Sequence, residues 1–270
     1  MHIVTCASCE LTYSQEVLTK VADRNMYEQS LFMDKYREIK NEKVYSHLEA
    51  AKADYIMAVV GRASAQKGRM LDIGSSNGQV MLSATRHGWA SHGIEINAEL
   101  VRESRDMGLG AIHGFFPNDM PCDWREFDLI TLLDVLEHAE QPMGFLKDLG
   151  QCIKEDGLVA VQVPNINSLI VRLEGSTNSN FCHGHWSHFS PDSLDNAMER
   201  TGFTKVFSET IISELDKILE YAPAQIVNTI KDITGSYPDN IEAISADYLH
   251  QHLMGYKLFG VYRKSSHMLG

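Results

Sequence analysis

Short apolar runs separated by helical patterns occupy the chain from Arg69 onward. The runs read "RMLDIG", "SHGIEI", "GAIHGF", "FDLITLLD" and "LVAVQVP". Between them, segments such as "AELVRESRDMG" and "PMGFLKDLGQCIKEDG" place apolar residues at helical spacing. Strands that alternate with helices are typical of a parallel sheet with helices on both faces. The pattern therefore predicts an α/β fold with a mostly parallel sheet.

The residues before Arg69 carry a different pattern. Apolar side chains recur at three- and four-residue steps from Glu28 to Val60, which predicts amphipathic helices lying on a larger domain. We therefore expect residues 1–65 to form an N-terminal extension, with a cysteine pair followed by a helical lid. Residues 66–265 are expected to form the main domain.

Beyond Pro191 the pattern predicts a helix, a strand, a long helical segment and a final strand. The helix is "SLDNAMERTG", closed by Gly202, and the strands are "FTKVFSETI" and "YKLFGVYRK". The helical segment between the strands spans about 213–253. An insertion at this place can shape a substrate pocket or a homodimer contact.

Composition and charge narrow the classes of partner. The 270 residues are 44% hydrophobic and 22% charged, as in ordinary globular proteins, with a net charge of -12. Since no Lys/Arg-rich run is present, neither nucleic acid nor an anionic membrane surface is expected as a partner. Without a signal pattern or an apolar stretch of ~20 residues, the chain is expected to be soluble and cytoplasmic. The five cysteines are odd in number and scattered, which indicates reduced thiols.

The stretch "LDIGSSNGQV" carries the most informative local signal. A strand ends in Asp72, a turn holds Gly74 and Gly78, and a helical pattern follows. Glycines at such a turn let the backbone approach a ligand closely, and the helix N-terminus offers free N–H groups. Ser76 and Gln79 stand where the dinucleotide pattern G-x-G-x-x-G needs glycine, which weakens a nicotinamide or flavin interpretation.

Two carboxylates near this turn bear on the choice of cofactor. Asp72 would repel a pyrophosphate but suits a cationic ligand such as S-adenosylmethionine, which carries an ammonium and a sulfonium. Glu95 ends the second strand roughly 20 residues further on, where an acidic side chain can accept hydrogen bonds from ribose hydroxyls. Both cofactor classes contain that ribose, so Glu95 does not choose between them. Taken singly, Asp72 is equally a candidate helix cap and Glu95 a surface charge.

These ordered motifs resemble the class I S-adenosylmethionine-dependent methyltransferases, in particular the UbiG-like group of small-molecule enzymes. The similarity runs from about Tyr27 to Lys264. "RMLDIGSSNG" resembles the cofactor glycine loop, "GWASHGIEIN" the ribose-binding strand, and "FDLITLLDVLEHAEQP" the fourth strand with its following loop. "IKEDGLVAVQVPNINS" is similar to the fifth strand, and "HFSPDSLDNAMERTGF" to the helix before the sixth. Ser75 and Ser76 depart from the usual residues of the loop.

The resemblance implies a Rossmann-like sheet of seven strands whose last strand is antiparallel and belongs to a β-hairpin near the C-terminus. It also implies S-adenosylmethionine as the cofactor, bound at the ends of the first four strands. The methionyl part would lie against Asp72, Gly74, Ser76 and Gly78, with Leu133 and Asp134 near it, the ribose and adenine against Glu95 and Ile96, and Phe115 beside the adenine.

Histidines crowd into "FCHGHWSHF", residues 181–189, which holds three of them and one cysteine. This loop and the loop "VLEHAEQP" both follow strands, so both are expected at the carboxyl edge of the sheet, where such folds place their sites. Histidine is well matched to the role of general base toward a hydroxyl acceptor near pH 7. His138, His185 and His188 are the candidates. A structural role for His138 is an equal alternative, and His188 is also a candidate anchor for the following helix.

A metal site is not predicted from this sequence. His183, His185 and His188 offer three ligands, but no carboxylate motif accompanies them and H-x-H-x-x-H is not a strong zinc spacing. Cys6 and Cys9 in "CASC" resemble the second half of a zinc ribbon whose first half is missing from this chain. Two thiolates do not complete a tetrahedral site, so we expect a reduced pair unless other ligands or a second subunit contribute.

The aromatic residues Tyr27, Phe32 and Tyr36 allow two interpretations. They could form a lid over the cofactor, or they could pack as the apolar face of an ordinary amphipathic helix, which we favour.

Together the motifs predict methyl transfer from S-adenosylmethionine to a small-molecule acceptor, with a hydroxyl of a biosynthetic intermediate or sugar as the first expectation. The alternatives are transfer to nitrogen or carbon, a NAD-dependent oxidoreductase, and a non-catalytic homologue that binds the cofactor.

Overall fold

The strands form a larger and a smaller sheet in a computed structural model that describes residues 2–15, 43–64, 66–240, 242 and 244–265. Within these residues, seven strands form the larger sheet in the order β5-β4-β3-β6-β7-β10-β9. Strands β3 to β7 pair in parallel, and β10 runs antiparallel to both β7 and β9. This confirms the predicted mostly parallel α/β sheet. The strands are β3 (Arg69–Ile73), β4 (Ala90–Glu95), β5 (Gly110–His113), β6 (Phe127–Leu133), β7 (Ile153–Pro164), β9 (Phe203–Ile211) and β10 (Lys257–Lys264).

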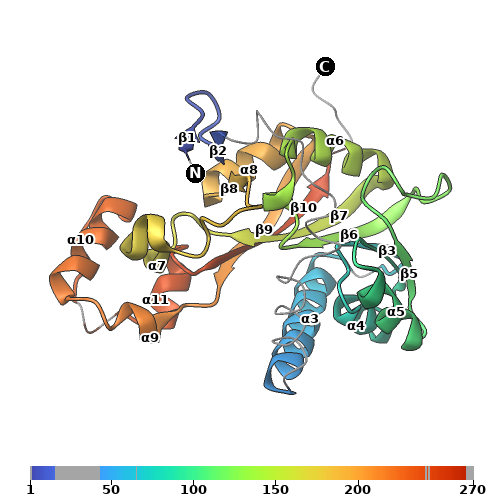
Figure 1. Cartoon of the computed structure of the whole chain (residues 1–270), viewed down its shortest axis with the longest axis horizontal. Coiled ribbons are helices and arrows are strands. Elements are labelled where there is room, and N and C mark those ends of the chain that lie inside the picture. The colour runs from blue at the N-terminus through green and yellow to red at the C-terminus, as the bar shows by residue number, and fades with distance from the viewer. Residues whose placement is uncertain (1, 16–42, 65, 241, 243, 266–270) are drawn as a thin grey trace.

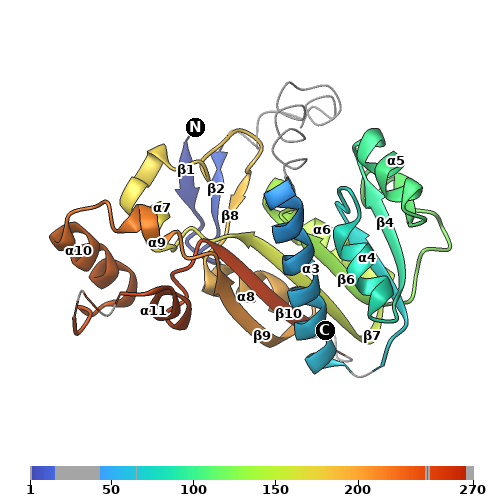
Figure 2. The same cartoon turned by 90° about the horizontal axis from the view of Figure 1, so that it is seen from below.

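Helices cover both faces of the larger sheet (Figures 1 and 2). Helices α6 (Pro142–Cys152) and α8 (Pro191–Glu199) lie on one face. Helices α3 (Lys43–Ala63), α4 (Gln79–Arg86) and α5 (Ala98–Asp106) lie on the other. The sheet is therefore the middle of three layers, as expected for a parallel sheet.

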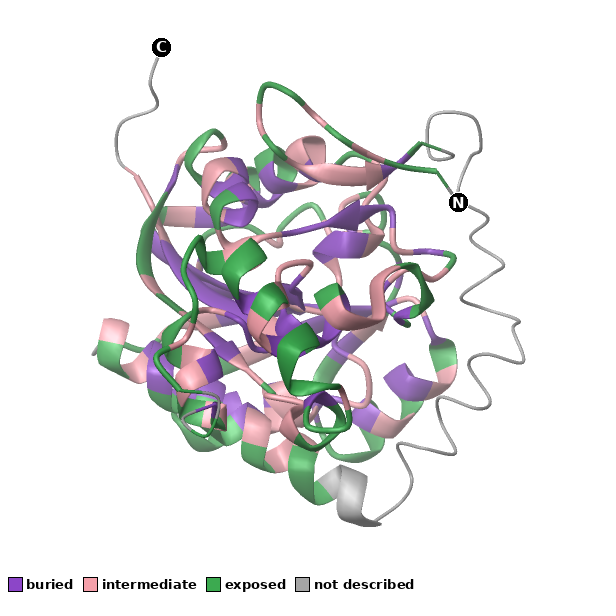
Figure 3. Ribbon diagram, turned by 90° about the vertical axis from the view of Figure 1, so that its left-hand side faces the viewer, coloured by how far each residue is buried: buried purple, intermediate pink, exposed green. Residues whose placement is uncertain are grey.

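The core lies between the sheet and these helices. The middle of the larger sheet is buried (purple in Figure 3). Strand β6 and the second half of β7 are buried on both faces, which explains why their sequences are nearly continuous apolar runs. Leu132 of β6 belongs to one buried cluster with Leu146 of α6 and Met198 of α8. Leu129, also on β6, belongs to the cluster on the opposite face, with Ile56 of α3.

Local capping signals set where two helices begin. Asn97 precedes α5, and its Oδ1 accepts hydrogen bonds from the amides of Glu99 and Leu100 at 3.0 and 3.2 Å. Ser190 precedes α8, where the amide of Ser193 donates to the Ser190 hydroxyl and the amide of Ser190 donates to the Ser193 hydroxyl. Both arrangements satisfy amides at a helix start, which places the preceding loops at a defined position.

A second sheet near the N-terminus does not follow from the sequence pattern. In the described part of the chain it has three antiparallel strands, in the order β1-β2-β8. Strands β1 (Ile3–Thr5), β2 (Thr12–Ser14) and β8 (Ser187–His188) have two or three residues each, too few for an alternating pattern to show. Because β2 pairs with β8, the start of the chain lies against the histidine loop at residues 181–189.

The helix expected over residues 142–157 ends earlier. Helix α6 stops at Cys152 and β7 begins at Ile153. Residues 153–157 include polar side chains on the exposed end of the strand, so their spacing does not distinguish a helix from a strand.

The insertion between β9 and β10 is helical, as predicted, but it is broken into short helices. Those in the described residues pack with α7 (Leu169–Glu174) around a separate apolar cluster at one end of the molecule (Figure 1). A 3-10 turn, η3 (Gly175–Thr177), follows α7. Strands β9 and β10 therefore pair across this insertion rather than through a tight hairpin. The helices are α9 (Leu215–Ile218), α10 (Pro223–Thr234) and α11 (Ala246–Gln251).

The expected lid residues and the expected absence of a membrane span both concern helical segments. Tyr27, Phe32 and Tyr36, proposed as lid or packing residues, lie outside the described residues. Among the helices that are described, none has both the length and the apolar character to cross a membrane.

Shortening Leu132 tests the core. Leu132 is fully buried on a central strand, so Leu132→Ala should lower the free energy of unfolding by about 2–5 kcal/mol. The exposed Leu219 is the matched control, and Leu219→Ala should change it by less than about 0.5 kcal/mol. Urea unfolding of both variants measures the difference, and equal stability would contradict the assigned packing.

Candidate active site

The glycine turn joins β3 to α4 at the carboxyl edge of the sheet. Gly74, Ser76 and Gly78 adopt positive φ angles of 70°, 50° and 83°. Glycine reaches this region without strain, whereas Ser76 does so at a cost. The amide of Ser76 donates to Glu95 Oε2 at 2.8 Å, so a buried carboxylate stabilises the unusual turn.

The two glycines are also required by the packing of the protein itself. A Cβ atom on Gly74 would lie 2.6 Å from Val135 Cγ2. A Cβ atom on Gly78 would lie 2.7 Å from Leu109 Cδ1 and 2.8 Å from Ser104 Oγ. Gly78 therefore allows the start of α4 to approach α5 closely, in addition to the cofactor role that the resemblance implies.

Asp72 and Glu95 are buried at the ends of neighbouring strands. Their residues are 2% and 7% exposed. Asp72 Oδ1 accepts a hydrogen bond from Thr131 Oγ1 at 2.6 Å, and Glu95 Oε1 accepts one from the amide of Asn97 at 2.8 Å. Helix α4 is preceded by Gly78 and has no side-chain cap, so Asp72 is not its cap. Glu95 is not a surface charge either.

Ile96 and Phe115 follow two paired strands at this edge. In the β4–β5 pair, Glu95 lies opposite His113, whose Nε2 donates to the carbonyl of Ile96 at 2.8 Å. Phe115 is 41% exposed, and its amide donates to Asp119 Oδ2 at 2.8 Å. An exposed aromatic ring offers a face on which a flat heterocycle can stack.

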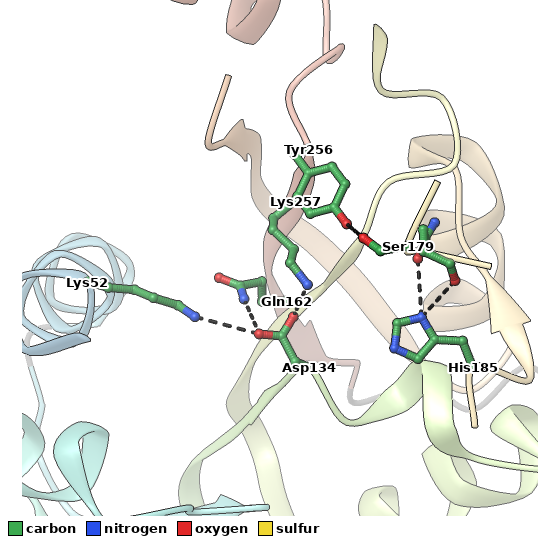
Figure 4. A network of polar contacts seen from close by, with 8 residues as sticks. Lys52, Asp134, Gln162, Ser179, His185, Tyr256 and Lys257 are labelled. Atoms are coloured by element: carbon green, nitrogen blue, oxygen red, sulfur yellow. Dashed lines mark hydrogen bonds and ion pairs between the residues drawn. The ribbon is translucent and has the colours of Figure 1, made fainter. Parts of the chain in front are cut away.

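Asp134 follows Leu133 at the end of β6 and binds two lysines (Figure 4). Lys257 Nζ lies 2.8 Å from Asp134 Oδ1, and Lys52 Nζ lies 3.7 Å from Oδ2. Gln162 Nε2 donates to Oδ2 at 2.8 Å. Burial acts to raise the pKa of Asp134, but the two ammonium groups outweigh it and hold the pKa well below its ordinary value. Asp134 is therefore a fixed negative charge near neutral pH.

Glu137, His138 and His185 form a cluster beside this network. Glu137 and His138 belong to the 3-10 turn η2 (Leu136–His138), which follows β6, while His185 comes from the loop after β7. One ligand atom of each side chain lies within 4.8 Å of the corresponding atoms of the other two. The rings of His138 and His185 meet edge to face, with their centroids 4.8 Å apart.

Backbone hydrogen bonds hold the histidine loop onto η2. His138 Nδ1 bonds the carbonyl of Gly184 at 2.8 Å, and the amide of Trp186 donates to the carbonyl of Glu137 at 2.8 Å. His185 Nδ1 bonds the carbonyl of Asn180 at 2.9 Å. A carbonyl oxygen can only accept, so Nδ1 carries the proton in both histidines. Both loops were expected to face the carboxyl edge, and the structure also brings them into contact with each other.

Burial keeps the ionisable groups of this cluster neutral. It lowers the pKa of His138, and it lowers the pKa of His185 to about 3, with a further contribution from His138. Burial, followed by the negative charge of Asp134, raises the pKa of Glu137 to about 8. The site therefore holds two neutral imidazoles, each with a lone pair on Nε2, and a carboxyl group that titrates near neutral pH.

The remaining residues of the histidine loop are placed differently. His188 lies in β8, opposite Thr12 of β2, and burial lowers its pKa to about 4. His183 contacts Trp186 edge to face. Cys182 is half-buried, and burial raises the pKa of its thiol. The structure thus brings His185 to His138 and places His188 in a strand pair.

Sequence reasoning did not name Glu137, Lys257 or Gln162 as site residues. Glu137 was available from the motif "VLEHAEQP", which was expected only to face this edge. Gln162 gives a clearer signal in retrospect, because it is a fully buried amide inside the apolar run of β7. Lys257 begins β10 and gives no local signal, since a lysine at a strand start is ordinarily solvated.

Cys6 and Cys9 lie in the turn between β1 and β2 and do not belong to the cluster. Hydrogen bonds from Ser8 lower the pKa of Cys6 to about 6. Among the described residues, the group of three or more metal-ligating side chains is Glu137, His138 and His185, so the cysteine pair gains no further ligand there.

A Rossmann-like sheet with carboxylates beside its glycine turn is typical of enzymes that bind a nucleoside cofactor. Comparison with known proteins shows which family of such enzymes this chain belongs to. The family model described as "Methyltransferase domain" matches residues 45–207. The chain therefore belongs to the class I S-adenosylmethionine-dependent methyltransferases, as the sequence resemblance predicted. This assignment decides between the two cofactor classes that the glycine turn left open.

Curated relatives include ubiquinone biosynthesis O-methyltransferases. The protein of Actinobacillus pleuropneumoniae is 26% identical over 122 residues, which cover 42% of this chain and 51% of that protein. The protein of Xanthomonas oryzae pv. oryzae is 24% identical over 168 residues, covering 54% and 65%. The chain thus spans about half to two thirds of the length of these relatives.

Solved structures share the fold at low sequence identity. Magnesium protoporphyrin IX methyltransferase from Synechocystis PCC 6803, with bound SAH (S-adenosylhomocysteine), has a TM-score of 0.59 at 12% identity, covering 90% of this chain and 98% of that chain. A SAM-dependent methyltransferase from Archaeoglobus fulgidus has a TM-score of 0.58 at 17% identity, covering 87% and 100%. These likenesses support the fold.

The close approach at Gly74 can be tested separately from its backbone angle. Gly74→Ala should weaken binding of S-adenosylhomocysteine at least about tenfold, because the new Cβ clashes with Val135 and moves the turn. Gly108 also has a positive φ, 79°, but a Cβ there meets no atom within 4 Å. Gly108→Ala should therefore leave the affinity within about twofold, since it adds backbone strain alone. Calorimetry measures the affinity of both variants for S-adenosylhomocysteine. An equal loss of affinity in the two variants would contradict the claim that the close approach at Gly74 shapes the binding site.

Proposed function

We propose that this protein transfers the methyl group of S-adenosylmethionine to a hydroxyl of a small molecule, either a biosynthetic intermediate or a sugar. The observation that carries the proposal is the position of Glu137, His138 and His185. They form a polar cluster at the same sheet edge as the glycine turn, in which Glu137 is buried and both histidines are half-buried; two of them lie on η2 after β6, and His185 lies on the loop between η3 and β8. Polar groups at this edge of an α/β sheet are typical of a reaction site.

The residues of the turn suit this cofactor. Asp72 and Glu95 offer buried carboxylates at adjacent strand ends, which fits a cationic amino acid moiety and a ribose better than a pyrophosphate. Ser75 Oγ is buried and has no hydrogen-bond partner among the described residues, so the turn holds a further polar atom for a ligand. Asp72, Gly74, Ser76 and Gly78 would hold the methionyl part, Leu133 and Asp134 would lie near it, and Glu95, Ile96 and Phe115 would hold the nucleoside.

The chemistry that these residues must serve is a displacement. When bound, S-adenosylmethionine supplies a methyl group on a sulfonium; a carbon–oxygen bond to the acceptor forms, the sulfur–carbon bond breaks, and the hydroxyl proton leaves. Holding the acceptor oxygen in line supplies much of the rate enhancement. The loop at residues 181–189 is held on η2 by hydrogen bonds and would help to exclude water from the cluster.

The acceptor proton would leave through the histidine pair. His138 and His185 each commit Nδ1 to a backbone carbonyl, so each presents the Nε2 lone pair to an acceptor. Either atom can accept the proton as a general base, although burial lowers the pKa of both imidazoles and makes His185, with a pKa of about 3, a weaker base than the sequence predicted. His188 is a weaker candidate within this proposal, because it lies in the β2–β8 strand pair.

The ubiquinone biosynthesis O-methyltransferases support a hydroxyl acceptor, since their names specify transfer to oxygen. Transfer to nitrogen or carbon would use the same cofactor residues and a different acceptor. A non-catalytic homologue would bind the cofactor without turnover.

The cofactor and the acceptor class can be tested in one series. Calorimetry should show binding of S-adenosylhomocysteine and at least about tenfold weaker binding of NAD, because the turn lacks two glycines of the dinucleotide pattern. Isotope-labelled S-adenosylmethionine should then label hydroxyl compounds, including phenols and sugars, in an acceptor panel. Labelling of amines alone would overturn the O-transfer proposal, and tighter binding of NAD would overturn the cofactor.

Removing His185 tests the acceptor side. His185→Ala should lower kcat by ~10²- to 10⁴-fold, because a group that assists proton loss contributes about that much. The affinity for S-adenosylhomocysteine should stay within about twofold, since His185 lies on the loop after β7 rather than on the glycine turn. His252 is exposed near the end of α11, and His252→Ala is the matched control with unchanged kcat. A normal kcat in His185→Ala would remove this histidine from the proposal.

A further inference from the structure

The cluster of Glu137, His138 and His185 has the composition and burial of a metal site. We propose that these three side chains bind one divalent transition-metal ion of the zinc class, with an open position for an oxygen of the acceptor. That the acceptor oxygen occupies the open position rests on the proposed function, whereas binding of the ion by the three side chains does not. This would replace the expectation from sequence that the histidines bind no metal.

Both imidazoles are oriented as metal ligands are. His138 Nδ1 donates to the carbonyl of Gly184 at 2.8 Å, and His185 Nδ1 donates to the carbonyl of Asn180 at 2.9 Å. Metal-binding histidines almost always donate their second ring N–H to such an acceptor, which fixes the tautomer and leaves the other nitrogen for the ion. The two Nε2 atoms therefore need no change of tautomer to bind a cation.

Glu137 lacks the partner that a buried carboxylate needs. The residue is 1% exposed, and neither carboxylate oxygen has a hydrogen-bond partner among the described residues. Lys257 acts on Glu137 electrostatically, but its ammonium is bonded to Asp134 at 2.8 Å. A buried carboxyl group without a partner must keep its proton unless a cation compensates the charge of its ionised form. A divalent ion between Glu137 and the two imidazoles would compensate that charge.

The ligand set favours zinc or a similar ion over magnesium or calcium. Two imidazoles and one carboxylate are the ligands of many catalytic zinc sites, which keep a further position open, whereas magnesium and calcium prefer oxygen ligands alone. The ligand atoms lie within 4.8 Å of one another. Bonds of roughly 2.0–2.2 Å to a central ion would bring them somewhat closer, a shift within the reach of side-chain rotation.

A bound ion would change how the acceptor loses its proton. Coordination to the ion lowers the pKa of a hydroxyl, so the proton can leave to solvent while the alkoxide stays bound beside the methyl donor. The two histidines then act as ligands, and the direct general-base role described above applies to the metal-free protein. The acceptor class becomes a compound whose hydroxyl can coordinate a metal ion.

Cobalt binding provides the test, because Co²⁺ replaces Zn²⁺ and reports its ligands by absorption. The full chain carrying Cys6→Ser and Cys9→Ser is used, so that the N-terminal thiols do not bind the ion. After treatment with a chelator, titration with CoCl₂ should show one ion per chain and a visible spectrum without a thiolate charge-transfer band. Glu137→Gln and His185→Ala in this background should each weaken binding at least about tenfold.

His183→Ala is the matched control, since His183 lies two positions from His185 and contacts Trp186 instead of the cluster. It should bind Co²⁺ within about twofold of its parent. Circular dichroism establishes that each variant is folded, and the spectrum of the parent protein identifies nitrogen and oxygen ligands even where a variant does not fold. Absence of stoichiometric binding, a thiolate band, or equal affinity in Glu137→Gln and its parent would each overturn the site.

The outcome is separable from that of the proposed function. Methyl transfer by a chain that binds no Co²⁺ would overturn the metal site and leave the function standing. Stoichiometric Co²⁺ binding by a chain that does not bind S-adenosylhomocysteine would support the metal site and overturn the function.

Discussion

Four acidic residues lie at one edge of the larger sheet, where its parallel strands end. The structure of the site depends on which groups compensate the charge of each carboxylate. Asp72 and Glu95 lie on β3 and β4, and Asp134 and Glu137 follow β6. A Thr131 hydroxyl binds Asp72, backbone amides bind Glu95, and two lysines bind Asp134. Among the four, Glu137 has carboxylate oxygens without a hydrogen-bond partner in the described residues. An uncompensated charge is expensive in a buried site, so Glu137 either keeps its proton, as its raised pKa indicates, or binds a cation.

The ion pairs that compensate Asp134 join parts of the chain that are far apart in sequence. Lys52 comes from α3 and Lys257 from β10, so helix, final strand and β6 meet at Asp134 (Figure 4). The η2 turn beside it binds the histidine loop through its backbone, and β2 pairs with β8 at the end of that loop. The N-terminal strands therefore border the proposed acceptor side.

The fold and the cofactor side of the site were largely predictable, because their signals are local. Continuous apolar runs mark strands buried on two faces, and the glycine turn, Asp72 and Glu95 follow directly from strand ends. The structure confirms the sheet and places these residues at its carboxyl edge. The short strands β1, β2 and β8 escaped prediction because two or three residues show no period, and the early end of α6 did so because "IKEDG" fits a strand and a helix alike.

The acceptor side shows what tertiary structure adds. Sequence alone singled out His138, His185 and His188 as one set, since residue type and position after a strand do not show which rings meet. The hydrogen bond between His138 and the carbonyl of Gly184 joins residues 46 positions apart, and the same packing places Glu137 close to His185. His188 lies instead in the strand pair β2–β8. By itself, the sequence determined the mostly parallel sheet, the glycine turn and the carboxylates at its edge, because each depends on neighbours along the chain. Only the tertiary structure decided which histidines share a site and that a buried carboxyl group lies close to them, because long-range packing sets both.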